Sequence, residues 1–256
     1  NKQNEIENNI VWELLDYERH VLLTEYPFLG VILDGIQWRI SEGETGMEER
    51  NFYVNRKSFI SEFEENRIYS IRKFHHMLLH YIFMHDLKPD DNEECYDICA
   101  DICAEKIILS MQNERLSLDE DDVRKAETDY FSQHIRPFSL SALLKEVSKN
   151  SSVLQRVKNC EKLFSFDSHS RWNEKTDSEE HKERLKLSKK LLTQMTTLSK
   201  GRGTSMMLAL KEAVKERQSY REFLKRFVMP MEENHLSDEE FDLISYTYGL
   251  RLNDKL

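Results

Sequence analysis

The sequence predicts an α+β fold that is predominantly helical. Its 256 residues include only 7 glycines and 4 prolines, so the residues that interrupt helices are scarce. Apolar residues recur at helical spacing along most of the chain, and only two short segments have the character of strands. With 39% hydrophobic and 10% aromatic residues, the chain has enough apolar side chains to form a core.

The first part of the chain predicts a long helix followed by a small sheet. Apolar spacing favours a helix over residues 5–30, which Tyr26-Pro27 interrupts because the residue before a proline disfavours helical dihedral angles. Residues 35–41 alternate between apolar and polar, and residues 51–55 are rich in strand-forming side chains. We expect these two segments to pair as a small antiparallel sheet.

The rest of the chain predicts helices joined by short polar segments. The expected helices cover residues 57–86, 93–113, 138–165, 176–198, 206–227 and 237–247. The first range holds two helices that meet near Glu65-Asn66, and an acidic run at 119–122 begins a further helix. Ser139 or Ser141 suits the N-cap of the helical range that begins at 138.

This order of elements predicts that the chain divides into two regions. Residues 1–115 form a core that includes the sheet, and residues 116–256 form a helical C-terminal extension that packs on it. Residues 89–92 suit a turn, residues 166–172 are irregular and polar, and the glycine-rich segment 200–205 is the best candidate for a hinge.

Charge and hydropathy restrict the class of partner. The formal net charge is −10 and the pI is about 5.5, which disfavours nucleic acid because binding to phosphates needs a basic face. The chain has no apolar run near 20 residues, so we expect no membrane span. Its polar beginning lacks the apolar segment of a secretion signal.

The cysteines favour a reducing compartment. Cys95, Cys99 and Cys103 recur every four residues on one expected helix, where disulfide bonds among them are geometrically poor, and Cys160 lies far along the chain. This pattern predicts a cytoplasmic protein. Thiolate binding of a metal is one reading of the three spaced cysteines. The favoured reading is that they are small buried residues on a packed helix face.

Residues 74–85, FHHMLLHYIFMH, contain four histidines. His76 and His80 are four apart, so on a helix they lie one turn apart on the same side and can point at one metal ion. This is the ligand spacing of an H-E-x-x-H zinc helix, but Met77 stands where the glutamate belongs. The alternative is that both histidines are ordinary core or surface residues.

Two further segments carry candidate ligands. Asp97, Asp101 and Glu105 fall on one face of a helix, and a carboxylate from a neighbouring helix is a normal third zinc ligand. Such spacing is also typical of a solvated acidic face. In the irregular segment, His169 could bind metal and Asp167 could orient a histidine ligand, or Asp167 could cap a helix beside an exposed His169.

Taken together, these segments resemble the N-terminal metallopeptidase domain of bacterial VWA-like proteins, which are encoded beside MoxR-type AAA+ ATPases. The family helix H-E-x-x-H-x-x-x-x-H falls on His76, His80 and His85. Its W-N-x-A-x-D-x-x-x-N segment falls on residues 96–105 and places the aspartate at Asp101. Its remaining motifs resemble Tyr53-Val54-Asn55, then Asp167, His169 and Trp172, then residues 219–227 and 241–250, in the family's order.

The resemblance implies a zincin-like core, a divalent metal and protein partners. Zinc is the implied ion, with His76 and His80 as ligands and Asp101 or His169 as the third. His85 and Asp167 are implied as additional ligands or as groups that orient the ligands. A MoxR-type AAA+ ATPase is the implied partner.

The chain departs from the family in three respects. Tyr96 and Asp97 stand where the second motif has tryptophan and asparagine. Met77 cannot take a proton from a metal-bound water, and loss of a general base costs about 10²–10⁴-fold in rate. The family continues into a VWA domain with a D-x-S-x-S metal motif, which this sequence lacks.

Three hypotheses follow for the function. The first is a proteolytically inactive metallopeptidase homologue that keeps a structural zinc and binds other proteins. The second is an active metal-dependent hydrolase that uses a base such as Glu64, Glu65 or Glu105. The third is a helical interaction module without metal, whose stability chelation would not change.

Overall fold

The fold is known from a computed structural model, which describes residues 2–87, 95–172, 178–198 and 206–211. All of these residues belong to one compact unit, residues 1–217. Several expected features lie outside the described residues: the turn at 89–92, the hinge at 200–205, most of the helix at 206–227, the helix at 237–247, and the segments 219–227 and 241–250.

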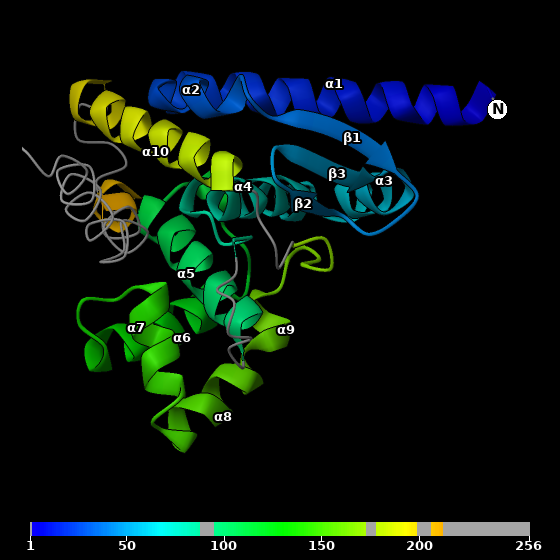
Figure 1. Ribbon diagram of the computed structural model, residues 1–256. Coiled ribbons are helices and arrows are strands. Elements are labelled where there is room, and N and C mark those ends of the chain that lie inside the picture. Colours follow the sequence, from blue (N-terminus) through cyan, green and yellow to red (C-terminus); the bar gives the residue numbers. More distant parts are fainter. Residues whose placement is uncertain (1, 88–94, 173–177, 199–205, 212–256) are drawn as a thin grey trace, which may run out of the picture. The chain divides into compact units, whose positions relative to one another are not determined.

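The N-terminal helix α1 (Lys2–Glu25) ends where the sequence predicts an interruption. A 3₁₀ turn, η1 (Pro27–Leu29), follows Tyr26 and leads into the short helix α2 (Gly30–Leu33). Val11, Leu15 and Leu22 on α1 are buried, and α1 contacts the later helix α3 (Figure 1).

The sheet is mixed, with the strand order β1-β3-β2. β1 (Gln37–Ser41) and β3 (Asn51–Asn55) are the two predicted strands, but they pair in parallel, so the predicted antiparallel pairing is wrong. The reason is a third strand, β2 (Gly46–Glu48), which forms an antiparallel hairpin with β3. Its turn is tight, and Glu49 adopts a φ of 52° there. β2 therefore takes one edge of β3 and leaves β1 the other.

Two asparagines define the next helices. The Asn55 side chain accepts a hydrogen bond from Ser58 N at the start of α3 (Arg56–Glu65). The Asn66 side chain accepts from Ile68 N and Tyr69 N at the start of α4 (Arg67–Phe83), which confirms the predicted junction. α4 is buried from Ser70 to Phe83 and is therefore the central helix.

The remaining helices follow α4 along the chain. They are α5 (Tyr96–Met111), η2 (Glu114–Leu116), α6 (Asp121–His134), α7 (Leu140–Val147), α8 (Ser151–Asn159), α9 (Glu161–Phe164) and α10 (Ser178–Leu198), and residues 206–211 are also helical. Ser139 caps α7 by accepting from Ala142 N, as expected. The predominantly helical α+β class is thus confirmed.

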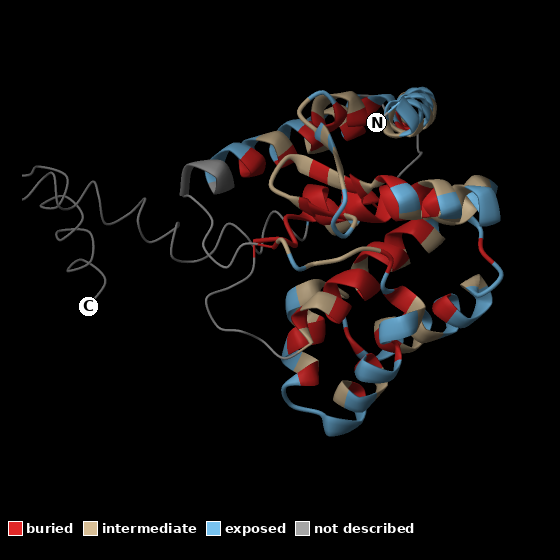
Figure 2. Cartoon of the chain, turned by 90° about the vertical axis from the view of Figure 1, so that its right-hand side faces the viewer, coloured by how far each residue is buried: buried red, intermediate tan, exposed pale blue. Residues whose placement is uncertain are grey.

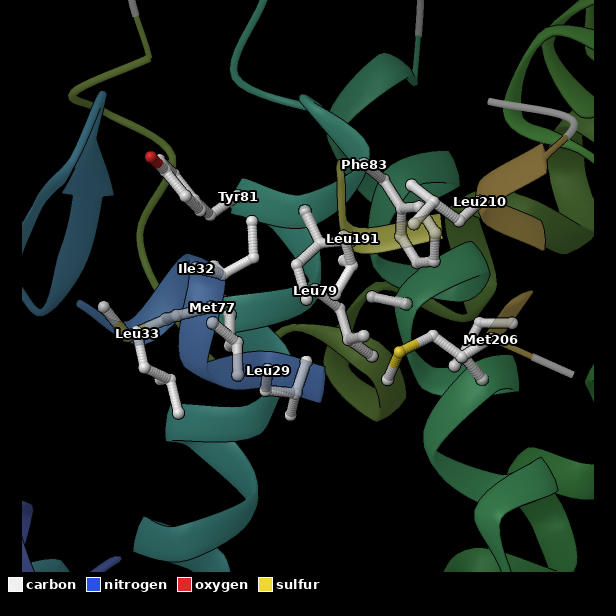
Figure 3. Close-up of a cluster of buried hydrophobic side chains, with 14 of the residues drawn as sticks. Leu29, Ile32, Leu33, Met77, Leu79, Tyr81, Phe83, Leu191, Met206 and Leu210 are labelled. Atoms are coloured by element: carbon white, nitrogen blue, oxygen red, sulfur yellow. The ribbon is translucent and has the colours of Figure 1, made fainter. Parts of the chain in front are cut away.

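Two large apolar clusters form the interior, and α5 contributes to both. One surrounds α4 and includes α2, part of α10 and the helical residues 206–211 (Figure 3). The other holds side chains of α5 to α9 together with Trp172. Figure 2 shows the buried residues on the inward faces of the helices. The division at residue 115 stays a prediction. Among the described residues, no helix is both long and apolar enough to cross a membrane.

Candidate metal centre

Five buried side chains converge where α4, α5 and the segment after α9 meet. They are His76 and His80 from α4, Asp101 from α5, and Asp167 and His169 from the irregular segment 166–172. Each offers one ligand atom, and these five atoms all lie within 4.8 Å of one another. The structure thus brings together the two predicted histidines, the predicted aspartate and both residues of the third motif.

The helix period explains the first pair of ligand atoms. His76 and His80 lie one turn apart on α4, and their Nε2 atoms are 2.8 Å apart. α4 packs against α5, which places Asp101 opposite this turn. Asp101 Oδ1 lies 3.1 Å from His76 Nε2, 3.2 Å from His80 Nε2 and 3.2 Å from His169 Nε2.

The spacing of these atoms fits ligands around one ion. Nitrogen and oxygen ligands bound to zinc at roughly 2.0–2.1 Å lie about 3.4 Å apart in a tetrahedron. The three Asp101 distances are close to this value, and the 2.8 Å between His76 Nε2 and His80 Nε2 is shorter, so Asp101 Oδ1 could serve as a ligand beside the imidazole nitrogens. Asp167 Oδ1 lies 3.5–4.0 Å from the same three nitrogens, which places it as a fifth donor.

The group is closed to water and carries polar atoms without hydrogen bonds. Side-chain exposure is 0% for His76, His80 and Asp167, 3% for Asp101 and 7% for His169. Within the described residues, neither carboxylate oxygen of Asp167 nor Nε2 of His169 has a partner in hydrogen-bond geometry, although His169 Nε2 lies within ion-pair distance of Asp101 and Asp167. Buried polar atoms without partners are costly, and a cation among them would remove that cost. The donor set therefore fits a metal.

The segment that supplies Asp167 and His169 is tied to the sheet. Ser168 N donates to Thr45 O at 2.8 Å, and Ser168 forms an isolated bridge with Gly46 at the start of β2. Trp172 stacks on His169, with 3.7 Å between ring centroids. Strand β2 was not predicted, so the sequence did not show this contact.

Two histidines of the group have a hydrogen-bonding partner on their other nitrogen. His76 Nδ1 lies 2.8 Å from Glu105 Oε1, and His80 Nδ1 lies 2.9 Å from His85 Nδ1. His85 therefore sits behind His80 and orients it, instead of belonging to the ligand group. His169 Nδ1 has a longer contact of 4.0 Å with Asp97.

The charges of the group are strongly coupled. Burial disfavours the charged form of His76, yet the carboxylates of Asp101 and Glu105 outweigh it and raise its pKa to about 9. Burial likewise opposes the charge of His169, but the two aspartates raise its pKa to about 10. Burial and the His76 cation lower the pKa of His80. Without an ion, imidazolium groups thus balance the carboxylates, and a metal would displace their protons.

The structure gives no support to the proposed alternative bases. Glu64 and Glu65 are exposed at the end of α3. Glu105 is fully buried behind His76, where one oxygen contacts that ring and the other accepts from Arg72. Met77 is buried in the apolar cluster near Ile32 and Leu33 (Figure 3).

The cysteines follow the favoured reading. Cys99 and Cys160 are buried in the second apolar cluster, and Cys95 and Cys103 pack against it. None of the four belongs to the ligand group found among the described residues.

Comparisons of the chain with known protein families, curated proteins and solved structures found no match. The metallopeptidase resemblance therefore rests on the motifs of this chain alone.

Proposed function

We propose that this protein is an inactive metallopeptidase homologue that holds one divalent metal ion, zinc, as a structural centre. The observation that carries the proposal is the convergence of three imidazole nitrogens and two carboxylate oxygens in a closed site. Structural zinc sites are filled by protein ligands, whereas catalytic sites keep an open position for water.

Charge supports a divalent ion. Three neutral imidazoles and the carboxylates of Asp101 and Asp167 carry two negative charges, which one divalent cation neutralises. A neutral cluster is what a buried site tolerates, because an unbalanced charge away from water is expensive.

The ion would join segments that are far apart in the chain. His76 and His80 belong to α4, and Asp101 belongs to α5. Asp167 and His169 belong to a segment that begins about 65 residues after Asp101 in the sequence. A metal that fixes such segments contributes its binding free energy to folding. We therefore assign the centre a stabilising role.

Two features argue against hydrolysis. Met77 occupies the position of the general base and packs in the apolar core. The ligand side chains are at most 7% exposed, which leaves no access for a peptide. We propose that the protein acts by binding other proteins, with the MoxR-type AAA+ ATPase as the partner that the motifs imply.

A metal-free interaction module is the second candidate. It is favoured by one observation: His76 contacts Asp101 and Glu105 within hydrogen-bonding distance, so protein groups can satisfy this imidazole on their own. The two candidates differ in the effect of chelation, which lowers the melting temperature only if a metal stabilises the fold.

The metal content of the purified protein distinguishes the structural metal centre from the metal-free module. Protein purified without a histidine tag should contain about one equivalent of zinc, and the double variant His76→Ala/His80→Ala should contain none. His75→Ala is the matched control, because His75 is a buried neighbour on α4 that bonds to Ile71 O and lies outside the ligand group. Absence of metal from the native protein, even after zinc is added, would refute the structural centre.

A further inference from the structure

The nitrogen of His76 that faces away from the ligand group is held by a buried ion pair. Glu105 Oε1 lies 2.8 Å from His76 Nδ1, and Glu105 Oε2 accepts from Arg72 Nε at 2.9 Å. Glu105 and Arg72 are both fully buried. Their opposite charges form an ion pair away from water, which reduces the cost of burying either group.

The side chain of Arg72 is also held by groups from η2 and α6. Its Nη1 donates to Leu116 O at 2.6 Å and to Asp121 Oδ2 at 2.8 Å. Its guanidinium also lies over the ring of Phe166, the residue before Asp167, with 5.5 Å to the ring centroid. Its Nε and Nη2 donate to Glu105 and its Nη1 donates to η2 and α6, so the position of Glu105 is set by α4, η2 and α6.

We propose that Glu105, held by Arg72, is a positioning residue that fixes the tautomer of His76 for metal binding. When Nδ1–H donates to Glu105, the proton is held on that nitrogen and the Nε2 lone pair points at the ligand group. The negative carboxylate also makes the imidazole a stronger ligand. This inference rests on the proposed metal centre.

The helix period explains why these two residues reach His76. Arg72 lies four residues before His76 on α4, and Glu105 lies four residues after Asp101 on α5. Arg72 thus lies on the same face of α4 as His76, and Glu105 lies on the same face of α5 as Asp101. Glu105 is separated from the ligand atoms by the imidazole ring, so it orients His76 and does not bind the ion.

The test compares Glu105→Gln with the native protein and with Glu18→Gln. Glu18 is also a buried glutamate paired with arginine, Arg115, but it lies on α1 outside the ligand group. Zinc affinity is measured by competition with a chelator, and the protein loaded with Co²⁺ gives a visible spectrum that reports ligand geometry. Glu105→Gln should bind zinc about 10–100-fold more weakly and shift the Co²⁺ spectrum. Glu18→Gln should match the native protein in both.

The outcomes separate this inference from the metal centre itself. If the native protein binds zinc and folded Glu105→Gln keeps the native affinity and spectrum, the positioning role is overturned while the centre stands. If the native protein binds no zinc, both are overturned. Should Glu105→Gln not fold, Arg72→Lys keeps the positive charge without the fork of donors. Native affinity and spectrum in that variant would equally overturn the role.

Discussion

Gly46 and Ser168 lie so close together that a side chain at position 46 would collide with the backbone. A Cβ added to Gly46 would come within 2.2 Å of the Ser168 carbonyl oxygen. The two residues form the bridge that joins β2 to the segment carrying Asp167 and His169. Glycine at 46 is thus required by close approach of two backbones.

Gly46→Ala should weaken metal binding because it displaces this segment from the ligand group. We expect the affinity for zinc to fall by at least about 10-fold, the size of effect seen when support of a ligand is lost. Gly35→Ala is the control, since its added Cβ would meet the nearest atom at an ordinary 3.5 Å. Chelator competition measures both variants, and equal affinity in the two would contradict the role of the bridge.

The metal-free protein should lose stability as the pH rises above neutrality. His76 and His169 have folded pKa values raised to about 9 and about 10 from 6.5, so their contribution is complete below pH 6.5 and is lost as the pH passes 9 to 10. His75 has the opposite sign, because burial lowers its pKa to about 4 and its contribution is lost as the pH falls toward that value. Melting temperatures of chelator-treated protein between pH 5 and 10 should therefore pass through a maximum near neutrality.

Metal binding at pH 7 should release protons. His76 and His169 are protonated in the ion-free site, and each must become neutral to bind an ion. We expect about two protons to be released per zinc ion. Calorimetric titration in buffers of different ionisation enthalpy measures this number. Binding without proton release would show that these imidazoles are already neutral at pH 7 before the ion binds, which would contradict their raised pKa values.

Met77→Glu should destabilise the protein without restoring hydrolysis. The side chain of Met77 is 2% exposed in the cluster of Figure 3, where a carboxylate would be unpaired at a cost of several kcal/mol. Met77→Leu keeps the volume and should cost less than about 1.5 kcal/mol. Denaturant titration gives both values. A Met77→Glu protein of native stability that cleaves peptides would show that position 77 faces the ion.

Local patterns in the sequence predicted much of the fold. The end of α1 just before Pro27 and the start of α4 just after Asn66 follow from proline sterics and side-chain capping, which act within a few residues. The parallel pairing of β1 and β3 could not be found in this way. It depends on the three-residue strand β2, which lies in a charged loop and whose pairing is set by tertiary contacts.

The candidate site was predictable to the extent that its members share a helix face. His76 with His80, and Asp101 on the next helix, follow from the 3.6-residue period. The approach of Asp167 and His169 depends on the bridge to Gly46, a contact across more than 120 residues that no local pattern reveals. The sequence contained one indication that Arg72 and Glu105 support the ligands: each lies four residues from a ligand on its own helix, His76 or Asp101. This spacing could be interpreted only once the structure showed that α4 packs against α5.

The metal centre is tested most directly by X-ray absorption at the zinc edge on protein loaded with one equivalent of zinc. A centre built from His76, His80, His169, Asp101 and Asp167 should show only nitrogen and oxygen ligands, at about 2.0–2.2 Å. The scattering pattern of imidazole rings should be present as well. Sulfur ligands at about 2.3 Å would place the ion on the cysteines, and failure to retain zinc at all would show that the converging side chains do not form a metal site.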